Sequence, residues 1–329
     1  MSQNSTMLAY GDAIRQGFCY LFDNDPSVFA IGQGLWSPWY VGNTMLDLDK
    51  LYGKARVIDT PVSEAACTGA AIGASLFGKR AVAIHPRMDF MILAADQMVN
   101  QAAKWSYMLG GQASPAVTIR GIVNRGGEQG AQHSQALHSW YAHIPGLRVV
   151  MPATPTDARD LLISSVLCDD PVLYIDDRWL YDVAEQDRDV DLQPLETVTP
   201  KLRRNGGDIT LVAASYSVQL CLEAAGLLEK EGIECGVIDL RVLNPMDSQL
   251  ITSEVSRSGR LLAVDGGWST CGLAGEVIAT AAERVLPRQW KAAPVRVTLP
   301  DSPAPTSGSL ERLYYPTVES VCVAARNMM

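Results

Sequence analysis

Several features that would point to a function at once are missing from this sequence. It contains no run of about 18 apolar residues, the length that a membrane-spanning helix needs. Its opening residues, MSQNSTM, have neither a basic stretch nor an Arg-rich amphipathic pattern, so we expect no export or organelle signal. It also lacks G-x-G-x-x-G after the first expected strand and G-x-x-x-x-G-K-S/T anywhere. Dinucleotide and P-loop sites are therefore without support.

Positive charge is also scarce, with 27 Lys and Arg against 36 Asp and Glu and a net charge of -9. This balance disfavours nucleic acid and anionic membranes as partners. The seven cysteines are odd in number, widely spaced and without a C-x-x-C pair. That pattern argues against a disulfide framework or a zinc site and fits a reducing cytoplasm, where we expect the protein. At 329 residues, 47% of them hydrophobic, the chain is long enough for two domains with full cores.

In the first part of the chain, short apolar runs rich in β-branched residues alternate with longer helical patterns. This alternation predicts a mostly parallel sheet covered by helices on both faces. Strands are expected at 27–31, 56–59, 81–84, 116–120, 147–151 and 172–175, and helices at 8–22, 62–77, 90–109 and 156–167.

The pattern changes between about residues 182 and 208. This stretch is charged, contains two prolines and ends in Gly-Gly-Asp, which is typical of a surface linker between domains. The alternation then resumes and predicts a second, smaller α/β domain. Its expected strands are 209–213, 236–240, 260–264 and 295–299, and its expected helices are 218–229, 247–256, 273–282 and 310–324.

The segment DTPVSEAACTGAAIGASLFG, residues 59–78, is the most informative one. Thr60 can cap a helix whose first position is Pro61, which would place Glu64 in or near the first turn. Two interpretations stay open. Glu64 either complements the helix dipole, a contribution of about 0.3–1 kcal/mol, or carries chemistry. Small residues on neighbouring faces of this helix permit close backbone approach: Gly69, Ala70, Gly73 and Ala74.

Two further segments carry polar residues in a pattern. The expected helix within residues 89–112 has Asp96, Asn100 and Lys104 at i, i+4 and i+8, a row more typical of a solvated face than of a site. Met, Trp and Tyr on the same helix hint at an interface, where such residues are enriched.

Three of the four histidines, His133, His138 and His143, fall between residues 126 and 146. A metal site is not indicated, because carboxylates or cysteines at ligand spacing are lacking. The glycine-rich loop with His133 is either a mobile active-site element or a surface loop with a capping histidine.

Taken together, these segments resemble the beta subunit of the first component of 2-oxo-acid dehydrogenase complexes of the pyruvate, branched-chain and acetoin types, which are transketolase-like. The resemblance covers nearly the whole chain, in order. It implies an α/β fold of two doubly wound domains, an N-terminal thiamin-pyrimidine-binding domain (1–185) and a C-terminal transketolase-type domain (208–329), joined by a linker (186–207). The matching stretches are RVIDTPVSEAACTGAAIGAS, ADQMVNQAAKWSYMLGGQ, GAQHSQALHSWYAHIPGLRVVMPATPTDARDLL, DPVLYIDDRWLY and PDSPAPTSGSLERLYYP.

The resemblance implies an enzyme that uses thiamin diphosphate to decarboxylate a 2-oxo acid and transfer the acyl or acyloin unit. In this family the cofactor lies between subunits of an α2β2 heterotetramer, and its diphosphate is anchored through magnesium by a GDG sequence. No GDG occurs here. We therefore expect a separate alpha-type subunit to hold the diphosphate and Mg²⁺, and this chain alone to be inert. No metal is assigned to this chain, since Cys168 and Asp170 stand where the relatives' potassium-binding segment has Asp and Asn.

The resemblance also implies the site residues. Glu64 would hydrogen-bond to the aminopyrimidine ring of the cofactor and share a proton with it, as a general acid–base group. Val62 and Arg87 would lie with Glu64 against the cofactor. His133 matches the family's loop histidine and would contact the substrate or intermediate as a hydrogen-bond donor.

Departures from the family pattern fall near the same site. Two acidic positions are lost, as Gln33 and Ile84, and Arg87 replaces the aromatic residue expected near the pyrimidine. Arg87 could face an anionic group of the substrate, for which a guanidinium is suited, or an acidic residue of the alpha subunit. A substrate or acceptor other than that of a housekeeping pyruvate complex is therefore predicted.

Two other functions stay open. One is the C-terminal half of a split transketolase-like enzyme, which would share Glu64 and the domain order but not the AQHSQ and QAAKWSYM stretches. The other is a non-catalytic scaffold subunit, which the altered segment 84–88 favours and the intact Glu64 and His133 oppose.

Overall fold

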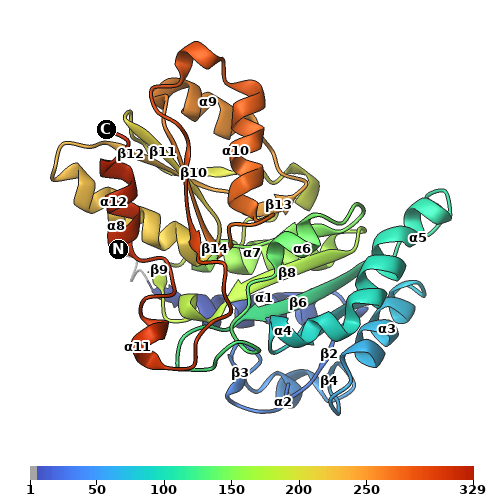
Figure 1. The fold of residues 1–329 in the computed structure, drawn as a ribbon. Coiled ribbons are helices and arrows are strands. Elements are labelled where there is room, and N and C mark those ends of the chain that lie inside the picture. Colours follow the sequence, from blue (N-terminus) through green and yellow to red (C-terminus); the bar gives the residue numbers. More distant parts are fainter. Residues whose placement is uncertain (1–5) are drawn as a thin grey trace, which may run out of the picture. The chain divides into compact units, whose positions relative to one another are not determined.

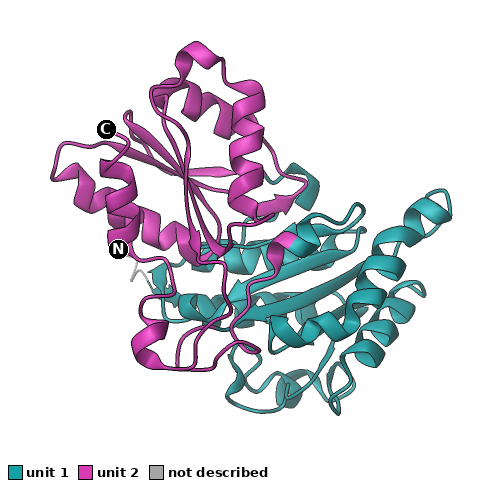
Figure 2. Cartoon of the chain, viewed as in Figure 1, with its two compact units in different colours: residues 1–124, 140–198 teal, residues 125–139, 199–329 magenta. Residues whose placement is uncertain are grey.

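The computed structural model describes residues 6–329 and divides the chain into two compact units (Figure 2). The first unit comprises residues 1–124 and 140–198, and the second comprises residues 125–139 and 199–329. Residues 1–5, in the opening segment where no targeting signal is expected, lie outside the described residues. The loop that carries His133 thus belongs to the second unit, although it lies within the sequence range 1–185 expected for the first domain.

The first unit is built on a parallel sheet whose strands run in the order β7-β8-β6-β5-β2-β4. Every residue of β6 and β8 is buried, which fits the apolar and β-branched side chains that make up most of both strands. The strands are β2 (Val28–Gly32), β4 (Val57–Asp59), β5 (Arg80–His85), β6 (Val117–Val123), β7 (Arg148–Val150) and β8 (Val172–Asp177).

Helices cover both faces of this sheet (Figure 1). The connections from β4 to β5 and from β5 to β6 run one way along the sheet, and the connection from β7 to β8 runs the other way. Because parallel crossovers are right-handed, α3 and the helical stretch before β6 cover one face and α7 covers the other, where α1 packs on it. The main helices are α1 (Tyr10–Asn24), α3 (Glu64–Ser75), α4 (Met88–Met91), α5 (Ala103–Met108) and α7 (Pro155–Leu167).

Most of the shorter elements around this sheet were not predicted, although the helix expected at 90–109 is present, divided into shorter helical stretches. Strands β1 and β9 form an antiparallel pair. Between α4 and α5 the backbone stays helical through a 3₁₀ turn (Ile92–Ala94) and a π turn (Gln97–Ala102). The remaining short elements are β1 (Met7–Ala9), β3 (Tyr40–Asn43), α2 (Leu48–Tyr52), α6 (His138–Ala142), β9 (Ala184–Gln186) and 3₁₀ turns at Arg178–Leu180 and Leu195–Thr197.

The second unit has a sheet in the order β10-β12-β11-β14-β15, parallel except for the edge strand β10. By the same handedness, α9 and α10 cover one face and α8 covers the other, together with α12 (Figure 1). The elements are β10 (Lys201–Arg204), β11 (Ile209–Ala213), α8 (Tyr216–Glu229), β12 (Cys235–Asp239), β13 (Val242–Asn244), α9 (Gln249–Ser258), β14 (Leu261–Trp268), α10 (Leu273–Arg284), a 3₁₀ turn (Pro287–Gln289), β15 (Val295–Leu299), α11 (Gly308–Glu311) and α12 (Val318–Arg326).

These elements confirm the predicted class of two doubly wound α/β domains, with two local corrections. The helix expected at 310–324 is wrong as a single helix, because it ends at Glu311 and α12 begins only at Val318. Pro316 disfavours helical backbone at the residue before it, and the hydroxyl of Thr317 caps α12 by accepting the Ser320 N–H at 3.1 Å. The stretch expected as a linker contains β10, an edge strand of the second sheet.

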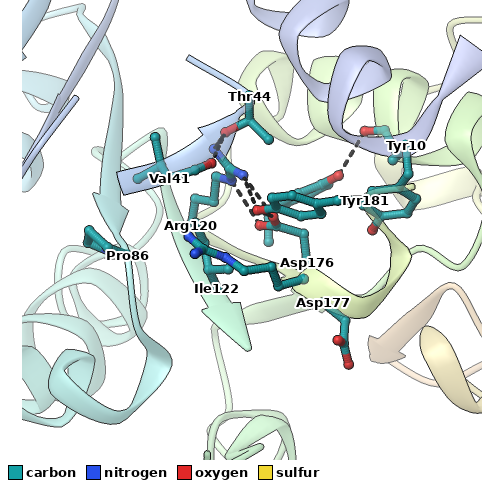
Figure 3. Close-up of polar contacts among 12 residues, drawn as sticks. Tyr10, Val41, Thr44, Pro86, Arg120, Ile122, Asp176, Asp177 and Tyr181 are labelled. Atoms are coloured by element: carbon teal, nitrogen blue, oxygen red, sulfur yellow. Dashed lines mark hydrogen bonds and ion pairs between the residues drawn. The ribbon is translucent and has the colours of Figure 1, made fainter. Parts of the chain in front are cut away.

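A fully buried ion pair lies inside the first unit (Figure 3). Arg120 on β6 donates from Nε and Nη2 to the two carboxylate oxygens of Asp176 on β8, at 2.8 and 2.7 Å. Both side chains are 0% exposed. Arg120 also donates to the hydroxyls of Thr44, at 3.0 Å, and Tyr181, at 3.1 Å. The guanidinium thus has hydrogen-bond acceptors on all sides, which a buried charge requires.

The same network holds β3 in place. The Thr44 hydroxyl donates onward to the backbone oxygen of Val41 at 2.7 Å. Arg178 donates to the backbone oxygen of Tyr40 at 2.7 Å. Buried and half-buried arginines therefore fix the segment that presents Tyr40.

Two further sequence expectations concern the whole chain. All seven cysteines are free. Among residues 6–329, no helix combines the length and apolar character needed to cross a membrane.

Candidate functional site

An open pocket lies in the first unit beside Glu64. It lies where the parallel strands β2, β4 and β5 end, the edge of an α/β sheet at which ligands usually bind. Its lining residues come from β2 and β5 and the residues just after them, from β3, from α3 and the segment before it, and from α4: Ile31, Gly32, Gln33, Tyr40, Thr60, Pro61, Ser63, Glu64, Cys67, Ala83, Ile84, His85, Pro86, Arg87 and Phe90.

Glu64 is the first residue of α3, and this corrects the predicted cap. Thr60 was expected to cap a helix that starts at Pro61, but the helix starts three residues later, after Ser63. Thr60 makes other contacts instead. Its backbone N–H donates to the backbone oxygen of Gly32 at 3.0 Å, and its hydroxyl accepts a hydrogen bond from the Cys67 thiol at 3.2 Å. The half-buried Glu64 carboxylate therefore sits at the positive end of the helix, beside backbone N–H groups without intrahelical partners.

The pocket also contains a buried histidine that the sequence analysis did not single out. His85, the last residue of β5, is 3% exposed, and its Nε2 lies 3.0 Å from the hydroxyl of Thr68 on α3. Burial lowers the pKa of His85 to about 4, so its ring is neutral at physiological pH. It contributes a hydrogen-bonding but uncharged surface beside Glu64.

The neutral state of His85 predicts a pH dependence of stability. Its pKa rises from about 4 in the folded chain to the ordinary 6.5 on unfolding, so the unfolded chain binds more protons between these values. The contribution of neutral His85 to the free energy of unfolding should therefore be fully present above pH 6.5. It should be lost as the pH drops towards 4, by about 3 kcal/mol in all. We expect His85→Gln to flatten this slope, as measured by urea denaturation between pH 7.5 and 4.5. Equal slopes for the two proteins would contradict the assignment.

The wall formed by the 33–40 segment depends on a glycine. Gly34 has a φ of +71°, and a Cβ there would lie 2.2 Å from the Tyr40 ring. Its backbone N–H donates to the Asp59 carboxylate at 2.6 Å, and the amide of Gln33 donates to the Tyr40 hydroxyl at 2.8 Å. Gln33, where the family usually has an acid, thus presents an uncharged side chain to the pocket.

Arg87 lines the pocket beside a second cation. Its side chain is half-buried, and its pKa is lowered by desolvation and by the nearby charge of Arg178, against the opposing effect of Asp89. Two guanidinium groups close together favour the approach of an anionic group. The pocket therefore has an acidic side, at Glu64, and a basic side, at Arg87.

An aromatic ring is present despite the loss expected at position 87. Phe90 on α4 lines the same pocket and is 39% exposed, a large fraction for a phenylalanine. Its spacing of one helical turn from Arg87 is the signal that would have located it. Val62 is 65% exposed and is absent from the pocket lining, so its predicted cofactor contact stays a prediction.

The structure thus brings Glu64 and Arg87 into one pocket of the first unit, whereas His133 lies in the second unit. His133 is half-buried, and its backbone N–H donates to Gly130 at 3.3 Å. Of the neighbouring histidines, His143 is exposed, and His138 pairs with Asp265 at 2.9 Å.

Cys168, Asp170 and Glu196 place their potential ligand atoms within 4.8 Å of one another. Burial raises the pKa of the Cys168 thiol to about 12, so it is protonated and donates to Glu196 at 3.3 Å. Asp170 is paired with Arg148 at 2.8 Å. A protonated thiol is a poor metal ligand, and the assignment of no metal to this chain stays a prediction.

Known proteins match the chain over nearly its full length. Residues 6–182 match the family described as transketolase, pyrimidine binding domain, and residues 199–321 match the transketolase C-terminal domain. The chain is 38% identical to the beta subunit of acetoin:2,6-dichlorophenolindophenol oxidoreductase of Cupriavidus necator, covering 99% of this chain and 97% of that protein. It is 36% identical to the mitochondrial beta subunit of the pyruvate dehydrogenase E1 component of Rattus norvegicus, covering 99% and 91%.

Two more matches agree with these. The Bacillus subtilis acetoin:2,6-dichlorophenolindophenol oxidoreductase subunit beta is 33% identical, with 96% of this chain and 95% of that protein covered. A solved structure described as a split gene transketolase, an inactive beta4 tetramer, superposes with a TM-score of 0.76 over 98% of each chain. At 21% identity, that structure supports the fold alone.

Proposed function

The chain belongs to the transketolase-like family that includes the beta subunits of pyruvate dehydrogenases and acetoin oxidoreductases, and on that premise we propose its activity. It is the beta-type subunit of a thiamin-diphosphate-dependent enzyme that decarboxylates a 2-oxo acid and transfers the acyl or acyloin unit. The observation that carries this proposal is the position of Glu64, at the start of α3 and in the wall of a pocket at the carboxyl ends of the strands.

Two groups in the pocket support a place for the pyrimidine end of the cofactor. Glu64 supplies a carboxyl group for a ring nitrogen, and Phe90 supplies an aromatic surface on which a flat ring can stack. Neither a GDG sequence nor a P-loop is present to grip a diphosphate. We propose that an alpha-type subunit holds the diphosphate and Mg²⁺ in an α2β2 assembly in the cytoplasm.

The chain's own residues would transfer a proton and orient the bound cofactor and substrate by hydrogen bonds. Glu64 would exchange a proton with the aminopyrimidine, and its place in the first turn of α3 keeps it fixed relative to the sheet. His85 and Gln33 would offer uncharged hydrogen-bonding groups around it. His133 would donate a hydrogen bond to the substrate. When bound, the cofactor supplies the electron sink for cleavage of the carbon–carbon bond.

The test is to co-purify the chain with its partner and assay a panel of 2-oxo acids with an artificial electron acceptor. The complex should decarboxylate at least one of them and bind thiamin diphosphate in the presence of Mg²⁺, while the chain alone should do neither in calorimetry. Tight binding by the isolated chain would contradict the shared site. Turnover of ketose phosphates instead of 2-oxo acids would favour the split-transketolase alternative.

Arg87 gives a second prediction, about specificity. If it binds an anionic group of the substrate, Arg87→Leu should raise KM for the best anionic substrate by about 10- to 100-fold with little change in kcat, because a charge-assisted hydrogen bond is lost. Arg87→Lys should recover part of this loss. An unchanged KM across charged and uncharged substrates, together with weaker association of the subunits, would instead assign Arg87 to the alpha subunit.

A further inference from the structure

The loop that carries His133, residues 125–139, is held at its beginning by contacts with the rest of the second unit. Glu128 donates its backbone N–H to the carboxylate of Glu311 on α11 at 3.0 Å. In return, the Glu128 carboxylate accepts the backbone N–H of Gly308 at 2.6 Å. Glu311 is only 9% exposed, and Glu128 has a φ of +60°, in the left-handed region that non-glycine residues seldom adopt. Such a backbone persists only where surrounding contacts hold it, and the reciprocal bonds to α11 supply those contacts.

The end of this loop is also held by contacts with the rest of the second unit. His138 Nε2 lies 2.9 Å from Asp265 Oδ1 on β14, and the two side chains are 1% and 5% exposed. Burial acts to raise the pKa of Asp265, but His138 and the Gly267 N–H outweigh it and lower that pKa, which keeps the carboxylate charged. One residue further, the Ser139 hydroxyl accepts the backbone N–H of Leu273 at 3.0 Å.

His133 lies midway between these two attachments, five residues from each. Between the first attachment and His133 the backbone turns tightly, with the His133 N–H bonded to Gly130. Gly130 has a φ of +73°, and a Cβ there would lie 2.6 Å from the Thr306 hydroxyl. The short loop is therefore fitted to the second unit along its length as well as at its ends.

We propose that Glu311 and Asp265 are positioning residues for His133, so that the second unit sets the place of a group used in the reaction. This inference rests on the proposed function, since it takes His133 as a group that contacts the substrate. The second unit would then contribute to catalysis, because it holds the loop of residues 125–139 that carries His133.

The first test uses the isolated chain and does not depend on activity. Arg125 is 7% exposed, so trypsin should cut after it only when the loop detaches. We expect Glu311→Ala and Asp265→Ala to speed this cut by about 10- to 100-fold, since cleavage follows the population of the open form. Glu311→Gln, which keeps an acceptor, and Glu283→Ala, on the exposed side of α10, should cut like wild type. The cleavage rates of the variants are compared under conditions in which the same fraction of each protein is folded, as measured by circular dichroism. Unchanged cleavage after Arg125 would overturn the proposal.

The second test uses the assembled enzyme. Glu311→Ala should lower kcat by about 10-fold or more while the affinity for thiamin diphosphate stays the same, and it should have no further effect in a His133→Ala background. Glu311→Gln should restore turnover. Full turnover in Glu311→Ala despite fast cleavage would overturn the positioning role. Wild-type turnover in His133→Ala would overturn it as well, but through the histidine's role in the proposed function, and the cleavage result distinguishes the two failures.

Discussion

Replacement of Glu64 by Gln should lower the decarboxylation rate of the assembled enzyme by roughly 10²–10⁴-fold, the usual contribution of a positioned acid–base group. Glutamine has nearly the same shape and can still form a hydrogen bond, but it cannot gain or lose a proton. Because Glu64 is half-buried and begins α3, the substitution should leave the fold intact. The measurement is kcat with the partner subunit, with circular dichroism to verify the fold.

The matched control for this prediction is Glu283→Gln. Glu283 lies at the end of α10, and its side chain is 71% exposed. It should show wild-type turnover. Wild-type turnover in Glu64→Gln as well would mean that the chain is a non-catalytic scaffold, the alternative that the altered segment 84–88 favours.

The second large effect is expected on stability. Arg120→Met should lower the free energy of unfolding by about 3–5 kcal/mol, because it leaves the carboxylate of Asp176 buried without its partner. The cost follows from the 0% exposure of both side chains and from the loss of the bond that holds Thr44. Urea denaturation of the purified chain measures it.

A double substitution and a surface pair serve as controls for Arg120→Met. Arg120→Met combined with Asp176→Leu removes both charges and should recover a large part of the loss. Arg326→Met, which breaks an exposed pair with Glu231, should change stability little. A loss in Arg120→Met no larger than that in Arg326→Met would show that the buried pair does not stabilise the first unit.

The sequence was sufficient to predict the fold class and most core elements, because the buried parallel strands are short, largely apolar runs rich in β-branched residues. The strands at 209–213 and 295–299 were predicted with the bounds that the structure has. Short elements such as β3 and β10 were missed, since four mostly half-exposed residues carry little periodicity. The family resemblance, which rested on five stretches in order, is confirmed by the two family matches.

The site was predictable only in part. Glu64 and Arg87, which the family resemblance implied as site residues, lie in one pocket, and their roles stay predictions. The pairing of Arg120 with Asp176 joins residues 56 positions apart, and no local pattern reports such a distance. The attachment of Glu128 to Glu311 spans 183 positions, so the membership of the His133 loop in the second unit could not be predicted either.

The most direct measurement is hydrogen–deuterium exchange at the thiazolium carbon of thiamin diphosphate bound to the assembled enzyme. If Glu64 activates the cofactor, exchange in the wild-type complex should be faster than turnover, and in Glu64→Gln it should be slower by at least about 10²-fold. Equal exchange rates in the two complexes, each with the cofactor fully bound, would contradict the account.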